Sequence, residues 1–167
     1  MMTIALHTIP LIEPTAENLA PFARWVGQPT TSPTLARGDI DCYHNICDAN
    51  DFNEHPVASY LICYPRPLLM EQIERHRLME EAFIPLKGDS VMVLGAPGEL
   101  DPQKLVAVYM DGSFGLILYR DTWHFAPFAL GQPATYMLLS GKDSGPDIEV
   151  VDLGPYPISQ PEYQERK

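Results

Sequence analysis

Two short segments of the sequence combine carboxylates and imidazoles at spacings that suit chemistry on one face of a strand. The first segment contains Glu74 and His76, and Glu81 follows after four further residues. In an extended strand, side chains two residues apart lie on the same face, so Glu74 and His76 are expected to point the same way. The second segment contributes His124. Two carboxylates and two imidazoles facing one pocket could bind a divalent metal or exchange protons with a substrate.

The elements that must position these side chains are predicted to be short strands. From residue 57 onward, short apolar runs alternate with turn signals, a pattern typical of a sandwich or barrel. The candidate strands cover residues 57–64, 68–76, 82–86, 90–96, 104–110, 114–119, 134–140 and 147–153. Periodicity leaves residues 104–110 open between a strand and a short helix. The candidate core residues are Phe83, Leu86, Val91, Val93, Leu116, Leu118, Met137 and Leu139.

The N-terminal third of the sequence lacks the repeated strand pattern seen from residue 57 onward. Residues 4–12 form a candidate first strand, and Thr15 is the expected N-cap of a short helix within residues 16–26, which Pro21 would shorten. Residues 27–41 are rich in turn residues and are expected to form a surface loop. The length of 167 residues predicts one domain. Its expected parts are an N-terminal strand, helix and loop (1–56), a barrel (57–153) and a tail without regular structure (154–167).

Composition narrows the classes of partner. The net charge of −11 argues against nucleic acid and against an anionic membrane surface, although a pocket can still hold a small carboxylate. No apolar run approaches the ~20 residues needed to span a bilayer, and the first residues do not resemble a signal peptide.

The cysteines are few and odd in number, which predicts free thiols and a cytoplasmic protein. They are Cys42, Cys47 and Cys63. His44 lies between the first two and could in principle complete a zinc site, but the paired spacing of a zinc knuckle is missing. Ordinary buried thiols are therefore the favoured interpretation.

The first segment resembles the first motif of the cupins. That motif reads His-x-His, three or four residues, Glu, six residues, Gly. Here Glu74 takes the place of the first His, and His76, Glu81 and Gly88 follow at the motif's spacing.

The second segment, residues 119–124, resembles the second cupin motif, Pro-x-Gly-x-x-His. His124 is retained, and Asp121 stands where the motif has Gly. The resemblance implies a mainly β fold, a cupin-type double-stranded β-helix or jelly-roll barrel, here with a short N-terminal helix. It also implies a divalent metal (Mn, Fe, Ni or Zn) and no organic cofactor. The implied metal ligands are Glu74, His76, Glu81 and His124.

A narrower resemblance is to the ureidoglycolate lyases of allantoin and purine catabolism. Residues 74–89 (ERHRLMEEAFIPLKGD) are similar to that family's Glu-Arg-His-Pro segment followed by Gln-Ala-Phe-Ile-Pro-Leu. Residues 121–127 are similar to its Gly-Val-Trp-His-His-Pro segment, and residues 14–27 to its opening. The resemblance implies a homodimer that cleaves ureidoglycolate, a small carboxylate, to glyoxylate and urea.

The same resemblance implies roles for individual residues. His76, His124 and Glu81 are the candidate catalytic residues. Arg120 is expected to face the substrate carboxylate. Arg75 is a further candidate for substrate binding, and Trp123 is either a pocket wall or a core residue.

Three positions depart from the lyase pattern and keep other functions open. Glu81 replaces a Gln, Phe125 replaces the second His of the His-His pair, and Ile117 replaces an Asn. The acidic pair of Glu74 and Glu81 favours a metal-dependent cupin with another reaction, an oxygenase or an isomerase. The losses at Phe125 and Ile117 favour a non-catalytic cupin that binds a small molecule.

Overall fold

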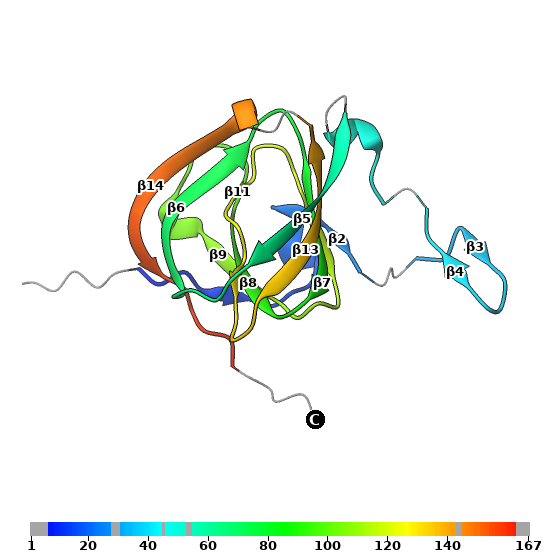
Figure 1. Ribbon diagram of the computed structural model, residues 1–167, viewed down its shortest axis with the longest axis horizontal. Helices are drawn as coiled ribbons and strands as arrows, with labels where there is room; N and C mark the ends of the chain where they lie inside the picture. The colour runs from blue at the N-terminus through cyan, green and yellow to red at the C-terminus, as the bar shows by residue number, and fades with distance from the viewer. Residues whose placement is uncertain (1–6, 28–30, 45, 53–54, 143–144, 163–167) are drawn as a thin grey trace, which may run out of the picture.

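Two β-sheets face each other and enclose an apolar core (Figure 1). The structure is a computed structural model that describes residues 7–27, 31–44, 46–52, 55–142 and 145–162. The strands of the first sheet are β1 (Leu11–Ile12), β6 (Leu69–His76), β8 (Ser90–Gly95), β9 (Val106–Met110), β11 (Trp123–His124), β12 (Phe128–Ala129) and β14 (Ile148–Pro157). Those of the second sheet are β2 (Ala23–Val26), β5 (Pro56–Cys63), β7 (Glu81–Lys87), β10 (Gly115–Leu118) and β13 (Ala134–Gly141).

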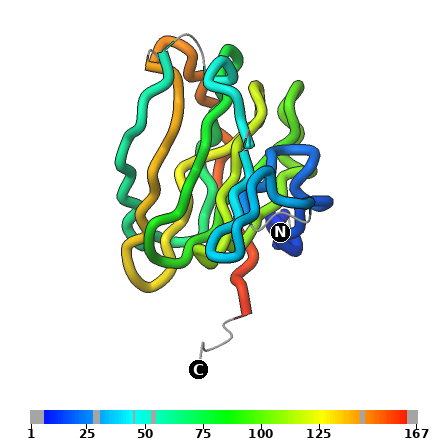
Figure 2. The backbone as a smooth tube through the Cα atoms, turned by 90° about the vertical axis from the view of Figure 1, so that its right-hand side faces the viewer, coloured from blue at the N-terminus to red at the C-terminus, as the bar shows by residue number. Residues whose placement is uncertain are grey.

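The first sheet has the order β1-β9-β8-β11-β6-β14, with β12 also paired to β8, and the second has the order β2-β10-β7-β13-β5. Figure 2 shows the long strands β5 and β13 running side by side in the second layer. The remaining elements are short. They are α1 (Ala16–Leu19), the 3₁₀ helices η1 (Ala49–Phe52), η2 (Pro102–Lys104) and η3 (Gly145–Asp147), and the hairpin of β3 (Leu35–Ala36) and β4 (Asp41–Cys42). The predicted cupin-type β-barrel class is confirmed.

Strand β8 explains how the layers are held together. All six of its residues are buried, as expected for an apolar strand covered on both faces. Met92 and Leu94 pack into the core between the two sheets, whereas Val91 and Val93 pack into a second cluster on the outer face of the first sheet. The two-residue period of the strand therefore divides its side chains between two apolar layers.

Both ends of the described chain help to cover this outer face. Ile9 and Ile158 form a parallel β-bridge and are buried in the second cluster. The Ile9 amide donates to the Pro157 carbonyl at 2.8 Å, and the Ser159 amide donates to the Ile9 carbonyl at 2.9 Å. Residues 149 positions apart in sequence thus close one side of the barrel together.

The N-terminal helix is shorter than predicted. Thr15 is its N-cap, since its hydroxyl accepts a hydrogen bond from the Asn18 amide at 3.1 Å. The helix ends at Leu19, however, and the chain then enters β2, which pairs with β10. Pro21 cannot donate a backbone hydrogen bond and separates the two elements. The apolar residues after Pro21 therefore extend the sheet rather than the helix.

Three other predicted segments differ from the elements seen in the structure. The ambiguous segment 104–110 is a strand, β9, preceded by η2. Residues expected to form a loop contain the β3–β4 hairpin, which projects from the barrel (Figure 1). The predicted tail is also partly regular, because β14 continues past a register shift to Pro157. Part of the predicted first strand, residues 4–6, lies outside the described residues.

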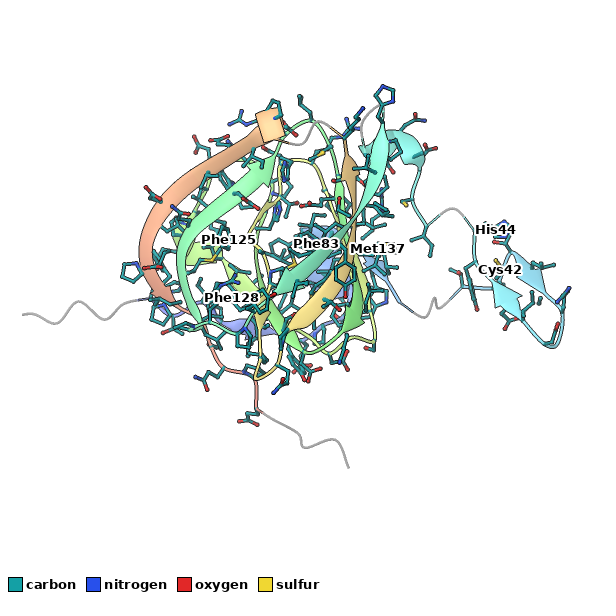
Figure 3. The ribbon with its side chains drawn as sticks, viewed as in Figure 1. Cys42, His44, Phe83, Phe125, Phe128 and Met137 are labelled. Atoms are coloured by element: carbon teal, nitrogen blue, oxygen red, sulfur yellow. The ribbon has the colours of Figure 1, made fainter. Side chains whose placement is uncertain are left out.

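Two predicted core residues are exposed. Leu86 and Met137 are 52% and 42% accessible, because their side chains lie on the outer face of the second sheet. Phe83 faces inward instead and belongs to the main core, as the labelled side chains in Figure 3 illustrate. None of the helices in the described parts of the chain is long and apolar enough to cross a membrane.

Candidate functional site

Neighbouring strands bring the two sequence segments together inside the barrel. Glu74 and His76 lie near the end of β6, and His124 lies on β11, directly paired with Glu74. Glu81 opens β7 in the opposite sheet, where it pairs with Leu118. The four polar residues predicted from spacing therefore come from both walls of the barrel and meet between them.

Three of these side chains form a compact group of potential metal ligands. One ligand atom each from Glu74, His76 and His124 lies within 4.8 Å of the other two. Both histidines are buried and Glu74 is partly buried. The Nδ1 atom of His76 is buried and has no hydrogen-bond partner among the described residues. Imidazole nitrogens beside a carboxylate are a donor set that suits a first-row divalent metal.

Glu81 joins the site through the histidines rather than as a member of that group. Its Oε2 lies 3.1 Å from Nε2 of His124 and 3.7 Å from Nε2 of His76. Burial acts to raise the pKa of Glu81, but the hydrogen bond with His124 and the charges of both histidines hold this pKa below its usual value. Glu81 is therefore a carboxylate at neutral pH.

The two ring nitrogens of His124 both face acceptors. Nδ1 lies 2.9 Å from the Thr122 carbonyl, and Nε2 lies beside Glu81. Burial acts to lower the pKa of His124, but the hydrogen bond and charge of Glu81, together with the Thr122 carbonyl, raise this pKa above its usual value. This arrangement favours the imidazolium form of His124, because only that form can donate from both nitrogens.

His76 has the opposite tendency. Burial is the main cause that lowers its pKa, and the neighbouring His124 lowers it further, which outweighs the opposing effect of Glu81. The two rings lie 5.6 Å apart between centroids. The lowered pKa of His76 and the raised pKa of His124 are shifts that suit a base and an acid that act together.

The candidate substrate-binding residues lie outside this group. Arg75 points to the other face of β6, where its guanidinium pairs with Asp121 and Glu149 and lies 4.1 Å from the centre of the Trp123 ring. Trp123 is buried in the outer apolar cluster and donates from its indole to the Gly98 carbonyl. Arg120 is exposed and donates to the Asn50 carbonyl. In this structure these three residues stabilise the periphery of the barrel.

The backbone explains the two glycine positions of the cupin motifs. Gly88 has φ +84°, and a Cβ atom there would lie 2.6 Å from the Pro133 carbonyl oxygen. Asp121, at the other position, also has a positive φ of 70°. Its carboxylate accepts from the Gly98 amide at 2.9 Å and pairs with Arg75. The turn before His124 therefore needs a left-handed residue, and here an aspartate supplies it with added contacts.

The second possible metal site does not come together. Cys42 and His44 lie on and beside the projecting hairpin (Figure 3), and Cys47 packs instead against the apolar cluster under η1. Among the described residues, the group of Glu74, His76 and His124 is the one with metal-ligand spacing. All three cysteines are free thiols, as expected, but only Cys63 is buried, whereas Cys42 and Cys47 are partly exposed.

A residue that the sequence did not single out lies near the site. Arg66, between Pro65 and Pro67, borders an open cavity with Phe125 and Gln72. Phe125 follows His124 directly, and Gln72 precedes Glu74 by two residues on β6. No local pattern singles out Arg66, because the turn between β5 and β6 decides where its side chain points.

A sequence profile described as ureidoglycolate lyase matches residues 5–159 of this chain. The chain belongs to the ureidoglycolate lyase family. The resemblance inferred from residues 74–89 and 121–127 is therefore confirmed, and the cluster of Glu74, His76, Glu81 and His124 lies inside the matched range.

Individual family members are similar at moderate identity. A ureidoglycolate lyase of Azotobacter vinelandii is 30% identical over 87 residues, which cover 51% of this chain and 52% of the relative. One from Burkholderia mallei (strain NCTC 10229) is 28% identical over 116 residues, or 66% of this chain and 68% of the relative. One from Escherichia coli (strain SMS-3-5) is 32% identical over 88 residues, or 51% and 55%. The chain thus spans about half the length of the first and third of these relatives.

One solved structure is similar in outline. It is a dTDP sugar isomerase from Desulfovibrio desulfuricans G20, with a TM-score of 0.48 and 19% sequence identity. The match covers 77% of this chain and 83% of the other.

Proposed function

We propose that this chain is a carbon–nitrogen lyase that cleaves ureidoglycolate, or a closely similar ureido hydroxy acid, to glyoxylate and urea. The observation that carries the proposal is the geometry of two buried imidazoles 5.6 Å apart inside the barrel, of which Nε2 of His124 lies 3.1 Å from the Glu81 carboxylate and Nδ1 of His76 has no partner among the described residues. Membership of the ureidoglycolate lyase family supports the choice of reaction.

The reaction requires one proton to leave and one to arrive. A base removes the proton of the substrate hydroxyl, the electrons form the C=O bond of glyoxylate, and the C–N bond breaks. An acid then supplies a proton to the departing urea nitrogen. His76, whose pKa is lowered by burial and whose Nδ1 has no partner among the described residues, suits the base, and His124, whose pKa is raised beside Glu81, suits the acid.

The position of Glu81 supports the assignment of His76 as the base and His124 as the acid. Its carboxylate lies nearer to His124 than to His76, at 3.1 Å against 3.7 Å. A carboxylate beside one of two imidazoles stabilises the protonated form of that imidazole. Proton transfer from His124 would leave Glu81 charged and ready to favour reprotonation from solvent, which would reset the site.

A divalent metal fits the same donor set, and Glu74, His76 and His124 are the residues that would hold it. A bound metal would act as a Lewis acid that polarises a substrate oxygen. His124 would have to give up the proton shared with Glu81 in order to bind it, since a metal ligand must be a neutral imidazole. Metal binding at this site should therefore be stronger at higher pH.

The proposal is tested with purified protein and ureidoglycolate, by following both glyoxylate and urea. The measurement is repeated after treatment with a chelator and after addition of Mn²⁺ or Zn²⁺. We expect both products in equal amounts, and a large loss of rate in His76→Gln and His124→Gln. If the folded protein forms neither product faster than heat-inactivated protein does, with or without metal, ureidoglycolate is not its substrate.

A metal-dependent cupin with another reaction is the second candidate. The convergence of Glu74 with two imidazoles favours it, because a carboxylate ligand lowers the charge of the metal site. Metal analysis of protein purified without added metal separates the two ideas. A stoichiometric metal in a protein that leaves ureidoglycolate unchanged would favour an oxygenase or isomerase.

Two further properties are proposed with the function. The three free cysteines support a reducing compartment such as the cytoplasm. We also expect a homodimer, and the exposed apolar side chains of Tyr60, Ile62 and Met137 on the second sheet offer a surface for it.

A further inference from the structure

An open cavity of about 740 Å³ lies at the start of β6. Two of its lining residues, Gln72 and Phe125, are neighbours in sequence of Glu74 and His124. Its volume is typical of small-molecule sites, which span roughly 300–1,000 Å³. Most of the lining is apolar. The lining residues are Arg66, Pro67, Leu69, Met70, Glu71, Gln72, Phe125, Phe128, Asp152 and Gly154.

Arg66 is the one cation among the residues that line this cavity. Its guanidinium lies 4.0 Å from the ring centre of Phe128 and 5.7 Å from that of Phe125. One terminal nitrogen donates to the Ala126 carbonyl at 2.5 Å. Two aromatic rings and a backbone oxygen therefore fix the position of the charge at the cavity wall.

This arginine has unused hydrogen-bonding capacity. Within the described parts of the chain, no carboxylate lies within ion-pair distance of Arg66. Four other arginines each pair with at least one carboxylate, namely Arg24, Arg37, Arg75 and Arg77. A guanidinium carries five N–H donors, and the hydrogen bond to Ala126 accounts for only one of them. Burial lowers the pKa of Arg66, but an arginine remains charged at neutral pH.

The two acidic residues of the lining do not neutralise this charge. Asp152 is exposed and accepts a hydrogen bond from the Gln72 side chain at 2.7 Å. Glu71 is also exposed. Both are screened by water at the rim, whereas Arg66 is partly buried against the aromatic wall. In a chain of net charge −11, an unpaired and partly buried cation is a favourable place for an anion.

We infer that this cavity binds a carboxylate with an apolar or aromatic body, whose carboxylate pairs with Arg66 and whose body packs on Phe125 and Leu69. A planar carboxylate can accept two parallel hydrogen bonds from a guanidinium. The inference concerns equilibrium binding and does not depend on the lyase reaction proposed above.

The test uses benzoate and its neutral isostere benzamide as probes, with calorimetric titration at pH 7.5. We expect saturable binding of benzoate that is on the order of tenfold tighter than binding of benzamide, because a charge-assisted pair is added to the same packing. Arg66→Met should weaken benzoate binding by on the order of tenfold or more and leave benzamide unchanged. Arg66→Lys should retain part of the preference, since it keeps the charge but not the fork.

Arg37→Met is the matched control. Arg37 lies on the projecting hairpin, where it pairs with Asp39, so its removal changes the net charge by the same amount far from the cavity. It should leave benzoate binding unchanged. Phe125→Ala should weaken both probes, because it removes part of the wall.

Three results would overturn the inference. They are equal affinity of the wild-type protein for benzoate and benzamide, a folded Arg66→Met variant that binds benzoate normally, and no binding of benzoate at millimolar concentration. The first and third need no variant, so the inference remains testable if Arg66→Met does not fold. Because no turnover is measured, a protein inactive on ureidoglycolate could still bind benzoate, and an active one could fail to.

Discussion

Replacement of Glu81 by Gln should move the alkaline limit of activity to lower pH. The amide keeps the shape of the side chain but removes the charge beside Nε2 of His124, 3.1 Å away. A hydrogen bond to a charged group contributes about 1.5–3 kcal/mol, and a neutral one about 0.5–1.5 kcal/mol. The imidazolium of His124 should therefore lose about 1–1.5 kcal/mol of stabilisation, which corresponds to roughly a tenfold drop in its protonated fraction on the alkaline side.

The assay is the pH profile of kcat for ureidoglycolate cleavage, together with an NMR titration of the histidine rings. In Glu81→Gln, activity on the alkaline side should fall roughly tenfold relative to the wild-type protein at the same pH, with a much smaller change near the optimum. Glu80→Gln is the matched control, because Glu80 pairs with Arg24 and does not contact either histidine. An alkaline limb that stays in place in Glu81→Gln while the His124 resonance titrates at lower pH would refute the assignment of His124 as the acid. A His124 resonance that titrates as in the wild type would instead refute the effect of Glu81 on the pKa of His124.

Three further changes test other parts of the site. The pKa of His76 is lower in the folded protein than in the unfolded chain, so the unfolded chain binds a proton at this ring first as pH falls, and stability decreases below about pH 6.5. His76→Gln should flatten that part of the curve of Tm against pH. An unchanged slope would argue against a buried neutral His76. Glu74→Gln should weaken binding of Zn²⁺ or Mn²⁺ in a competition titration by about tenfold or more, and equal affinity would remove Glu74 from the metal ligands. Asp121→Ala should lower Tm by some 2–4 °C more than Asp121→Gly does, which corresponds to about 1 kcal/mol of unfolding free energy. Both variants lose the pairing with Arg75, but only alanine keeps the strain at φ 70°. The reverse order of Tm would show that this strain is negligible.

The barrel was predictable because its strands carry strong local signals. The run at residues 90–96 is apolar from Val91 onward, and all six residues of β8 are buried. The N-terminal helix was overextended because the apolar residues after Pro21 fit a helix as well as a strand. Their pairing with β10, which is about 90 residues away in sequence, decided the outcome, and a local pattern carries no such information.

The candidate site could be predicted only as far as spacing reaches. Alternation along one strand correctly separated Glu74 and His76 from Arg75, whose side chain lies on the opposite face. Alternation does not show which carboxylate faces which imidazole. The contact of Glu81 with His124 crosses from one sheet to the other and depends on how the barrel closes.

The left-handed turn at Asp121 also escaped sequence reasoning. Its place in the motif marked it as a departure from Gly, but the compensating contacts with Gly98 and Arg75 come from distant segments. Arg66 is a similar case, since the position of its guanidinium depends on the rings of Phe125 and Phe128, which the fold places beside it.

The bridge between Ile9 and Ile158 has a consequence for how the protein is made. During synthesis, Ile9 emerges long before its partner, and the outer apolar cluster cannot close until residue 158 has left the ribosome. The nascent chain must therefore carry an unfinished apolar surface until the segment around Ile158 has emerged. Contacts this distant in sequence also slow folding, since the entropy of closing the loop is lost before the contact forms. The segment around Ile158 thus completes the barrel.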